Sequence, residues 1–362
     1  MQKSWLDSLR GNGDIVPQVA TLTKALLSCN QFTLAISVFA KKLREGDEIR
    51  VVAPSLSLSI ISKDVRKTAV QRFEQMGFNV SFGAHVEETD LVSSSSIKSR
   101  VADIHEAFGD PHVKAVVAVI GGWNANQILR YLDFDLIRSN PKIFCGYSDI
   151  TALNNAMLAK SGLVTYSGPV FSSFGMVKGF DYTLDYFRRC LVLQKPFKVE
   201  ASEYWSNDQW YKDQENRRFI KNEGHIAINN GTAEGRVIGG NLCTFNLLQG
   251  TEYMPRLKNS ILLIEDDEET NANIFDRDLQ SLIHQPGFDS VRGMIIGRFE
   301  NLSNITDDAL ARIIKGKKEL DHMPVIANVE CSHTSPIATL PIGGTAMISA
   351  EPGRTSIEVV RH

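Results

Sequence analysis

The 362-residue sequence has few cysteines and no excess of charge, and each shortage excludes a class of protein. The five cysteines are scattered and form no C-x-x-C pair, which argues against a disulfide framework and favours a reducing, cytoplasmic compartment. The 39 Lys and Arg residues against 42 Asp and Glu give a net charge of −3, so there is no basic excess to bind a nucleic-acid polymer. The sequence contains no H-E-x-x-H pair and no cluster of His and carboxylate ligands, and we expect neither a metal nor another cofactor.

The sequence also lacks an apolar run long enough to cross a membrane. The moderately apolar stretch 26–40 is interrupted by polar side chains and is shorter than the roughly 20 apolar residues that a span needs. Lys41 and Lys42 follow this stretch, whereas the basic residues of a secretory signal precede its apolar part. We therefore expect a cytoplasmic protein without a membrane partner, in which residues 1–40 form a loosely attached helical extension.

The composition is that of a globular protein, and the length favours about two domains. From residue 48 to residue 161, short β-rich runs alternate with helical patterns. We expect strands over 48–53, 78–82, 113–120 and 143–145, and helices over 64–76, 99–108, 124–132 and 150–161. This alternation predicts an α/β domain with a doubly wound parallel sheet.

The second half of the sequence predicts a smaller, β-rich α/β domain. Its expected strands are 233–238, 261–264, 294–296, 325–327 and 345–348, and its expected helices are 275–284 and 307–315. A polar and aromatic stretch separates the two halves and suggests a loop or an insertion. The predicted organisation is an extension over 1–40, an amino-terminal domain over 41–194, a loop over 195–224 and a carboxyl-terminal domain over 225–362.

The sharpest local signal is a short strand followed by a glycine and a serine. Strand 143–145 leads into Gly146, and the next expected helix starts just after Ser148, so the hydroxyl lies exposed on a tight strand-to-helix turn. This is the geometry of a nucleophile elbow, in which the N–H of Asp149 points the same way. Ile150 replaces the second glycine of that motif, and the alternative is that Ser148 only caps the helix.

A pair of glycines follows the apolar run 113–120. Glycines at the carboxyl end of a central strand let a backbone N–H approach a ligand closely, and the N–H of Gly122 is therefore a candidate oxyanion donor. The alternative is an ordinary turn between a strand and a helix. The G-x-G-x-x-G spacing of a dinucleotide-binding turn is absent, which argues against a nicotinamide cofactor.

A nucleophilic serine needs a base, and the base needs an orienting acid. His333 stands in a loop of small residues that follows strand 325–327, and His225 is a weaker candidate. Glu265 closes the apolar strand 261–264, where a carboxylate lies at the rim of the sheet. Taken singly, the context of His333 favours a structural role over a catalytic one, and the alternative for Glu265 is a place in a solvated acidic turn.

These segments together resemble the LD-carboxypeptidase family of serine peptidases over about residues 41–360. The resemblance implies that Ser148 is the nucleophile, Glu265 the orienting acid and His333 the general base. It also implies a Rossmann-like amino-terminal domain, a smaller β-rich carboxyl-terminal domain, a cleft between them and, as is usual in the family, a homodimer. The motifs that carry the resemblance are Gly46-Asp47, Val51 to Ser55, Gly121-Gly122, Pro141-Lys142, Gly146 to Leu153, Gly239 to Leu242, Ile264 to Asp266, Cys331 to His333 and Pro341 to Gly343.

Within that family, two features resemble the microcin C immunity branch. The first is the glycine turn with Trp123 and Asn124, and the second is an aromatic stretch with Trp205 and Trp210, which Glu223 follows. The branch stacks a loop aromatic on an adenine, which either loop tryptophan could do because every base has a π-face. The alternative for these tryptophans is packing in a lid or in a dimer contact. Asp266 and Glu269, by contrast, have the acid spacing of ordinary LD-carboxypeptidases.

The resulting expectation is a metal-free serine carboxypeptidase or amidohydrolase. Its substrate would be a small peptide or a peptidyl or aminoacyl nucleotide conjugate, held beside an oxyanion hole formed by the N–H groups of Gly122 and Asp149. The alternative substrate is a murein tetrapeptide, from which the enzyme would release terminal D-alanine. The alternative of another class is a non-catalytic protein that binds a small molecule between two α/β lobes.

Overall fold

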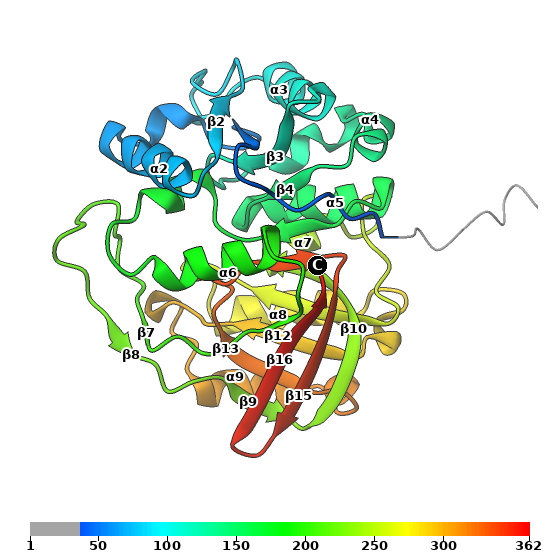
Figure 1. The fold of residues 1–362 in the computed structure, drawn as a ribbon. Helices are drawn as coiled ribbons and strands as arrows, with labels where there is room; N and C mark the ends of the chain where they lie inside the picture. The colour runs from blue at the N-terminus through cyan, green and yellow to red at the C-terminus, as the bar shows by residue number, and fades with distance from the viewer. Residues whose placement is uncertain (1–36) are drawn as a thin grey trace, which may run out of the picture. The chain divides into compact units, whose positions relative to one another are not determined.

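Two large β-sheets with their helices, together with a two-stranded ribbon, form residues 37–362, the part of the chain that the computed structural model describes (Figure 1). The expected helical extension falls on residues 1–40, and residues 1–36 lie outside the described part. Val38 pairs with Leu163 in an isolated parallel bridge, and Ala40 is buried. Among the described helices, none is long and apolar enough to cross a bilayer.

The first sheet has six strands in the order β14-β5-β4-β3-β1-β2. Its five amino-terminal strands pair in parallel, and β14 pairs antiparallel with β5. The residues of β3 and β4 are almost all buried, as expected for strands that are covered on both faces. The strands are β1 (Glu48–Val52), β2 (Asn79–Phe82), β3 (Val113–Ala118), β4 (Ile143–Cys145), β5 (Thr165–Ser167) and β14 (Leu340–Ile342).

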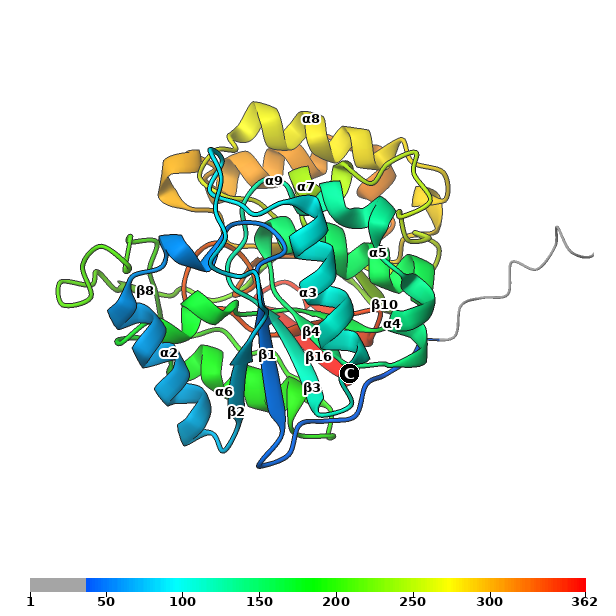
Figure 2. The same ribbon diagram turned by 90° about the horizontal axis from the view of Figure 1, so that it is seen from above.

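Helices follow the strands of this sheet, and Figure 2 shows α2 and α3 on either side of β1 and β3. In α2, the Ser62 hydroxyl caps the first turn, and Val65, Ala69 and Phe73 are buried at helical spacing. The helices are α2 (Lys63–Gln75), α3 (Ile97–Gly109), α4 (Phe134–Ser139), α5 (Thr151–Ser161) and α6 (Asp181–Leu191).

The helix expected over 124–132 is wrong in type. The structure has a short 3₁₀ helix over Ala125–Tyr131, and the separate helix α4 begins after Asp133. Two competing hydrogen-bond acceptors account for this. The carboxylate of Asp149 accepts the N–H groups of Asn124 and Ala125, and the carboxylate of Asp133 caps α4.

The second sheet has eight strands in the order β6-β16-β15-β10-β11-β12-β13-β9. Its central strands β10 to β13 run parallel, and antiparallel strands flank them on both sides. The strands are β6 (Phe197–Lys198), β9 (Ile226–Asn229), β10 (Gly231–Asn241), β11 (Ser260–Glu265), β12 (Gly293–Gly297), β13 (Val325–Val329), β15 (Thr345–Glu351) and β16 (Arg354–Arg361). The helices are α7 (Leu242–Asn246), α8 (Ala272–Ile283) and α9 (Asp307–Lys315).

The fold prediction is confirmed: a doubly wound α/β domain precedes a second, β-rich α/β domain. The sheets are not divided cleanly along the chain, because β14 joins the first sheet and β6 joins the second. The boundaries placed at residues 194 and 225 stay a prediction. The stretch between them contains β6 and a ribbon of β7 (Tyr204–Trp205) and β8 (Ile220–Lys221).

Helix α5 follows the first sheet and hydrogen-bonds to the second. Nearly all residues of α5 are buried. Asn155 donates to the carbonyl of Gly239 (2.9 Å) and accepts the N–H of the same residue (3.0 Å). The hydroxyl of Thr151 accepts the N–H of Asn241 (3.0 Å). A Cβ at Gly240 would lie 2.4 Å from the Thr151 hydroxyl, so only glycine permits this approach. The helix that follows Ser148 is thereby fixed to the sheet that carries Glu265.

Candidate active site

Ser148 lies on the turn between β4 and α5, as the elbow motif predicts. Its φ is 63°, a left-handed conformation that a non-glycine residue rarely adopts. The structure records no side-chain cap for α5, whose N-cap residue is Ile150. The Ser148 hydroxyl bonds instead to an imidazole, which disfavours the helix-cap interpretation.

Three side chains from both sheets lie in a hydrogen-bonded row. The Oγ of Ser148 is 3.0 Å from Nε2 of His333, and Nδ1 of His333 is 2.7 Å from Oε2 of Glu265. With the proton on Nδ1, the imidazole donates to Glu265 and its Nε2 accepts from the serine. A Cβ at Gly297 would lie 2.7 Å from the Cβ of Glu265 and from the Cβ of Ser332, so this glycine lets the acid and the histidine turn approach each other.

Carboxylates control the charge of the imidazole. Burial by itself lowers the pKa of His333, but the buried carboxylate of Glu265, together with Asp267 and Glu300, outweighs burial and raises the pKa to about 9. Burial raises the pKa of Glu300 to about 7, against the opposing effect of His333. The row therefore stabilises an imidazolium, the charge that the histidine acquires when it takes a proton from a serine.

The Gly121-Gly122 turn lies against the serine turn. A Cβ at Gly121 would be 2.9 Å from both Cβ and Oγ of Ser148, and Gly122 has a φ of 147°. The Asp149 carboxylate holds the two turns together, because it accepts the hydroxyl of Ser55 (2.6 Å) and the N–H of Asn124 (2.9 Å). The sequence indicated the backbone N–H of Asp149 as an oxyanion donor. It gave no sign that the buried side chain of Asp149 joins the two turns.

A cavity of about 400 Å³ opens over the row. Ser148 and His333 line it, together with Gly122 and two of the tryptophans from the sequence analysis, Trp123 and Trp210. Trp123 is 64% exposed, whereas Trp210 is half-buried and also lines a small adjoining pocket beside His333. The nucleophile, the base and two aromatic faces therefore border the same space.

Three of the expected substrate-binding residues lie outside the lining of this cavity. Asn124 is buried behind the glycine turn, where its side-chain oxygen accepts from Arg100 (3.0 Å). Trp205 lies under the guanidinium of Arg298, 5.0 Å from ring centroid to Cζ. Glu223 is exposed in the loop. The structure thus separates the two loop tryptophans, which the sequence could not do.

Two further residues of the site were not expected from the sequence. Tyr147 lines the cavity, and its ring centroid is 5.3 Å from that of His333. Glu300 follows β12 and lines the same cavity. The alternative base His225 is bonded to Glu330 instead (2.7 Å). Within residues 37–362, no group of three or more His, Cys, Asp or Glu side chains is arranged to hold a metal ion.

The sequence matches two family models that together span most of the folded chain. The LD-carboxypeptidase N-terminal domain covers residues 49–168, and the LD-carboxypeptidase C-terminal domain covers residues 234–348. The chain belongs to the LD-carboxypeptidase family of serine peptidases. Membership of this family makes it a peptidase, and thus a hydrolase.

Relatives in this family resemble the chain over nearly their whole length. YocD of Bacillus subtilis, which its name describes only provisionally as a carboxypeptidase, is 53% identical over 90% of this chain and 100% of its own. The microcin C7 self-immunity protein MccF of Escherichia coli is 32% identical over 88% of this chain and 95% of its own. The crystal structure of an MccF-like protein from Bacillus anthracis covers 90% of this chain and 100% of its own, with a TM-score of 0.89 and 55% identity.

The charge of the histidine can be tested by titration. We expect the imidazole of His333 to titrate near pH 9 in the free protein, and Glu300→Gln to lower that pKa because it removes a negative charge that favours the protonated ring. NMR titration of the histidine ring protons measures both values. Glu319→Gln, an exposed carboxylate outside the cavity lining, is the control and should leave the titration unchanged. An unchanged pKa in Glu300→Gln would contradict the electrostatic account.

Proposed function

We propose that the protein is a serine carboxypeptidase or amidohydrolase in which Ser148, His333 and Glu265 act as nucleophile, general base and orienting acid. The observation that carries this proposal is the hydrogen-bonded row of these three side chains at the floor of the cavity. In the neutral ring, which the pKa of about 9 makes the minor form at pH 7, the buried Glu265 (2% exposed) holds the proton on Nδ1 of His333 and leaves Nε2 able to accept. These are the roles of a Ser-His-acid triad.

The reaction proceeds by acyl transfer. The Oγ of Ser148 attacks the amide carbonyl while Nε2 of His333 takes the hydroxyl proton, and the resulting oxyanion accepts from the N–H groups of Gly122 and Asp149. The C–N bond then breaks, and the protonated His333 gives its proton to the leaving amine. Water then adds to the acyl-enzyme while the same imidazole takes its proton, and the imidazolium gives that proton to Oγ of Ser148 as the C–O bond breaks and the acid is released.

A peptidyl or aminoacyl nucleotide conjugate is our proposed substrate class. Trp210 supports it, because this half-buried ring lines the cavity that holds the nucleophile and can stack on a base. MccF has been solved in complex with aspartyl sulfamoyl adenosine, in a structure that is 31% identical and superimposes with a TM-score of 0.81. A cytoplasmic homodimer that acts on such small conjugates is part of the same proposal.

The charge of the cavity narrows the acyl part of that substrate. Its lining includes the carboxylates Asp208, Asp267, Glu268, Glu269 and Glu300, and no Lys or Arg among the described residues lines it. Of these carboxylates, Asp208 is paired with Arg217 (2.6 Å). Since Asp267, Glu268 and Glu269, joined by Glu300 when it is ionised, outnumber the imidazolium of His333, we propose that the enzyme favours neutral or basic acyl groups over acidic ones.

The same acidic lining supports a murein tetrapeptide as the alternative substrate. The ammonium group of a diamino acid in such a peptide would find its counter-charge there, and the enzyme would release terminal D-alanine. A non-catalytic binding protein is the alternative of another class. A fluorophosphonate distinguishes it, because the probe labels a serine that an imidazole activates and leaves an inactive binder unlabelled.

Replacement of the nucleophile is the direct test. We expect Ser148→Ala to lower turnover about 10⁴-fold or more and to abolish labelling by a fluorophosphonate, because the backbone oxyanion donors alone cannot form the acyl-enzyme. Ser260→Ala is the control, since that buried serine bonds the carbonyl of Leu257, outside the cavity lining. Circular dichroism verifies that both variants fold. Wild-type hydrolysis by Ser148→Ala would overturn the assignment.

The two tryptophans of the loop test the substrate class. We expect Trp210→Ala to weaken binding of a nucleotide conjugate by about 1–3 kcal/mol through loss of base stacking, and to leave a murein tetrapeptide less affected. Trp205→Ala provides the comparison, because that ring contacts Arg298 and does not line the cavity. Steady-state kinetics on both substrates measure the difference. Release of D-alanine by the wild-type enzyme without any action on the conjugate would favour the alternative substrate.

Conjugates that differ only in acyl charge test the acidic lining. We expect kcat/KM for a lysyl conjugate to exceed that for an aspartyl conjugate about tenfold or more, equivalent to about 1.4 kcal/mol. The double variant Glu268→Gln with Glu269→Gln should narrow this ratio, whereas exposed carboxylates outside the lining, Glu74→Gln with Glu319→Gln, should not. Equal rates for both conjugates in the wild-type enzyme would contradict the charge argument.

A further inference from the structure

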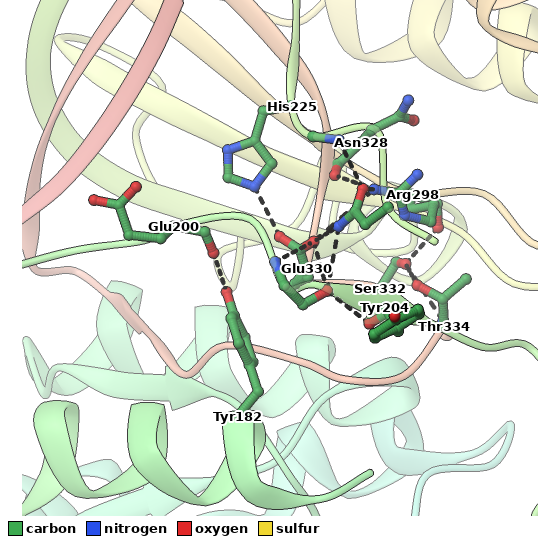
Figure 3. A network of polar contacts seen from close by, with 12 residues as sticks. Tyr182, Glu200, Tyr204, His225, Arg298, Asn328, Glu330, Ser332 and Thr334 are labelled. Atoms are coloured by element: carbon green, nitrogen blue, oxygen red, sulfur yellow. Dashed lines mark hydrogen bonds and ion pairs between the residues drawn. The ribbon is translucent and has the colours of Figure 1, made fainter. Parts of the chain in front are cut away.

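A second buried carboxylate, that of Glu330, lies three residues before His333. The residue is 1% exposed. Figure 3 shows its side chain at the centre of a polar network. Its Oε1 accepts from the N–H and the hydroxyl of Ser202 (3.1 Å each) and from Nδ2 of Asn222 (2.5 Å). Its Oε2 is 2.7 Å from Nε2 of His225. All of these partners belong to one segment, residues 202–225, which we call the aromatic loop.

Arg298 joins the same network from the end of β12. Its Nη2 donates to Oδ1 of Asn222 (2.6 Å) and to the carbonyl of Asn328 (3.0 Å), and its guanidinium covers the ring of Trp205. The Ser332 hydroxyl donates to the carbonyl of Arg298. The residue next to His333 and the aromatic loop are therefore held by the same arginine.

The aromatic loop also contacts the other side of the histidine turn. Ser206 and Ser335 exchange two backbone hydrogen bonds of 2.7 Å each. Arg217 donates to the Ser335 hydroxyl (3.0 Å) and pairs with Asp208, a residue of the cavity lining. His333 thus stands between two points of attachment to the loop, which carries Trp210 into the cavity.

We propose that Glu330 is a positioning residue that couples the aromatic loop to His333. The buried carboxylate fixes Ser202, Asn222 and His225 on the turn that carries the base, so that the loop's position and the alignment of His333 with Ser148 change together. This proposal rests on the proposed function, because it assigns Glu330 a role in the reaction of that site.

Geometry, and not charge, is the means by which Glu330 acts. The groups that raise the pKa of His333 are Glu265, Asp267 and Glu300, whereas the charge of Glu330 faces His225 and Arg298. The hydrogen bonds from His225 and Ser202 keep the pKa of Glu330 low in spite of its burial, so it stays ionised and binds its donors strongly. A displacement of about 1 Å at a reacting group can cost about 10²-fold in rate, so modest loosening of this network is measurable.

The variant Glu330→Gln tests the proposal with little change in shape. Its amide oxygen can still accept from Ser202 and Asn222, and its NH₂ can donate to His225 in the other tautomer. We expect labelling of Ser148 by a fluorophosphonate, measured well below the melting temperature, to slow tenfold or more. We also expect limited proteolysis within the aromatic loop to become faster. The probe reacts at the serine itself, so its rate reports the alignment of His333 separately from stacking at Trp210.

The control is Asp103→Asn, which alters another buried carboxylate that pairs with a histidine, His85 (2.6 Å), outside the cavity lining. It should lower the melting temperature and leave the labelling rate within twofold of the wild type. A purely structural role for Glu330 predicts that same result for Glu330→Gln, and this result would overturn the proposal.

Asn222→Ala provides a second route, because it removes one of the loop's bonds to Glu330 and the loop's bond to Arg298 while it keeps the carboxylate. This variant should also slow labelling. In the double variant, the effects of Asn222→Ala and Glu330→Gln on the labelling rate should be less than additive. If Glu330→Gln fails to fold, Asn222→Ala decides alone, and a wild-type labelling rate in it would overturn the coupling. Absence of labelling in the wild-type enzyme would instead refute the proposed function, and the positioning role would fall with it.

Discussion

The hydrogen bond between Ser148 and His333 depends on two sheets that are held at a fixed separation. The serine follows β4 of the first sheet, and the histidine follows β13 of the second. Asn155 and Thr151 on α5 set this separation through bonds to the backbone of Gly239 and Asn241 in β10, on either side of Gly240, where a side chain would collide with Thr151. Because a proton transfers only across a short contact, the packing of one buried helix decides whether the site can work.

Carboxylates serve the candidate site in two different ways. Glu265 touches the imidazole and, with Asp267 and Glu300, shifts its titration, so these groups act through their field. Asp149 and Glu330 are also buried, but they accept from N–H and O–H donors of other segments, Asp149 through Oδ2 and Glu330 through both oxygens. Buried carboxylates with several donors join segments that share no secondary structure. Hydrogen bonds to Asp149 and Glu330 therefore fix the shape of the site, whereas Glu265, Asp267 and Glu300 set the charge of its imidazole.

Sequence patterns predicted the features that depend on residues close together in the chain. The apolar run of β3, the elbow at Ser148 and the positions of Glu265 and His333 at strand ends all follow from neighbours in the chain. Strand β9 was missed because it has only four residues, and β16 was missed because its half-buried residues mix with polar ones. The separation of Trp205 from Trp210 and the bonds of Glu330 were out of reach, since the residues that decide them are about 90 to 130 positions away.

The strand β14 completes the first sheet although it lies far along the chain. Leu340 pairs with Ser167, and Ile342 with Thr165, so that β14 forms the edge of the sheet beside β5. During synthesis the amino-terminal part can therefore collapse early, but its edge stays open until more than 340 residues have left the ribosome. An open edge is a template for wrong pairing with another chain. A nascent chain that pauses before β14 emerges would thus expose β5 to aggregation, and the last strand to join protects the first domain to form.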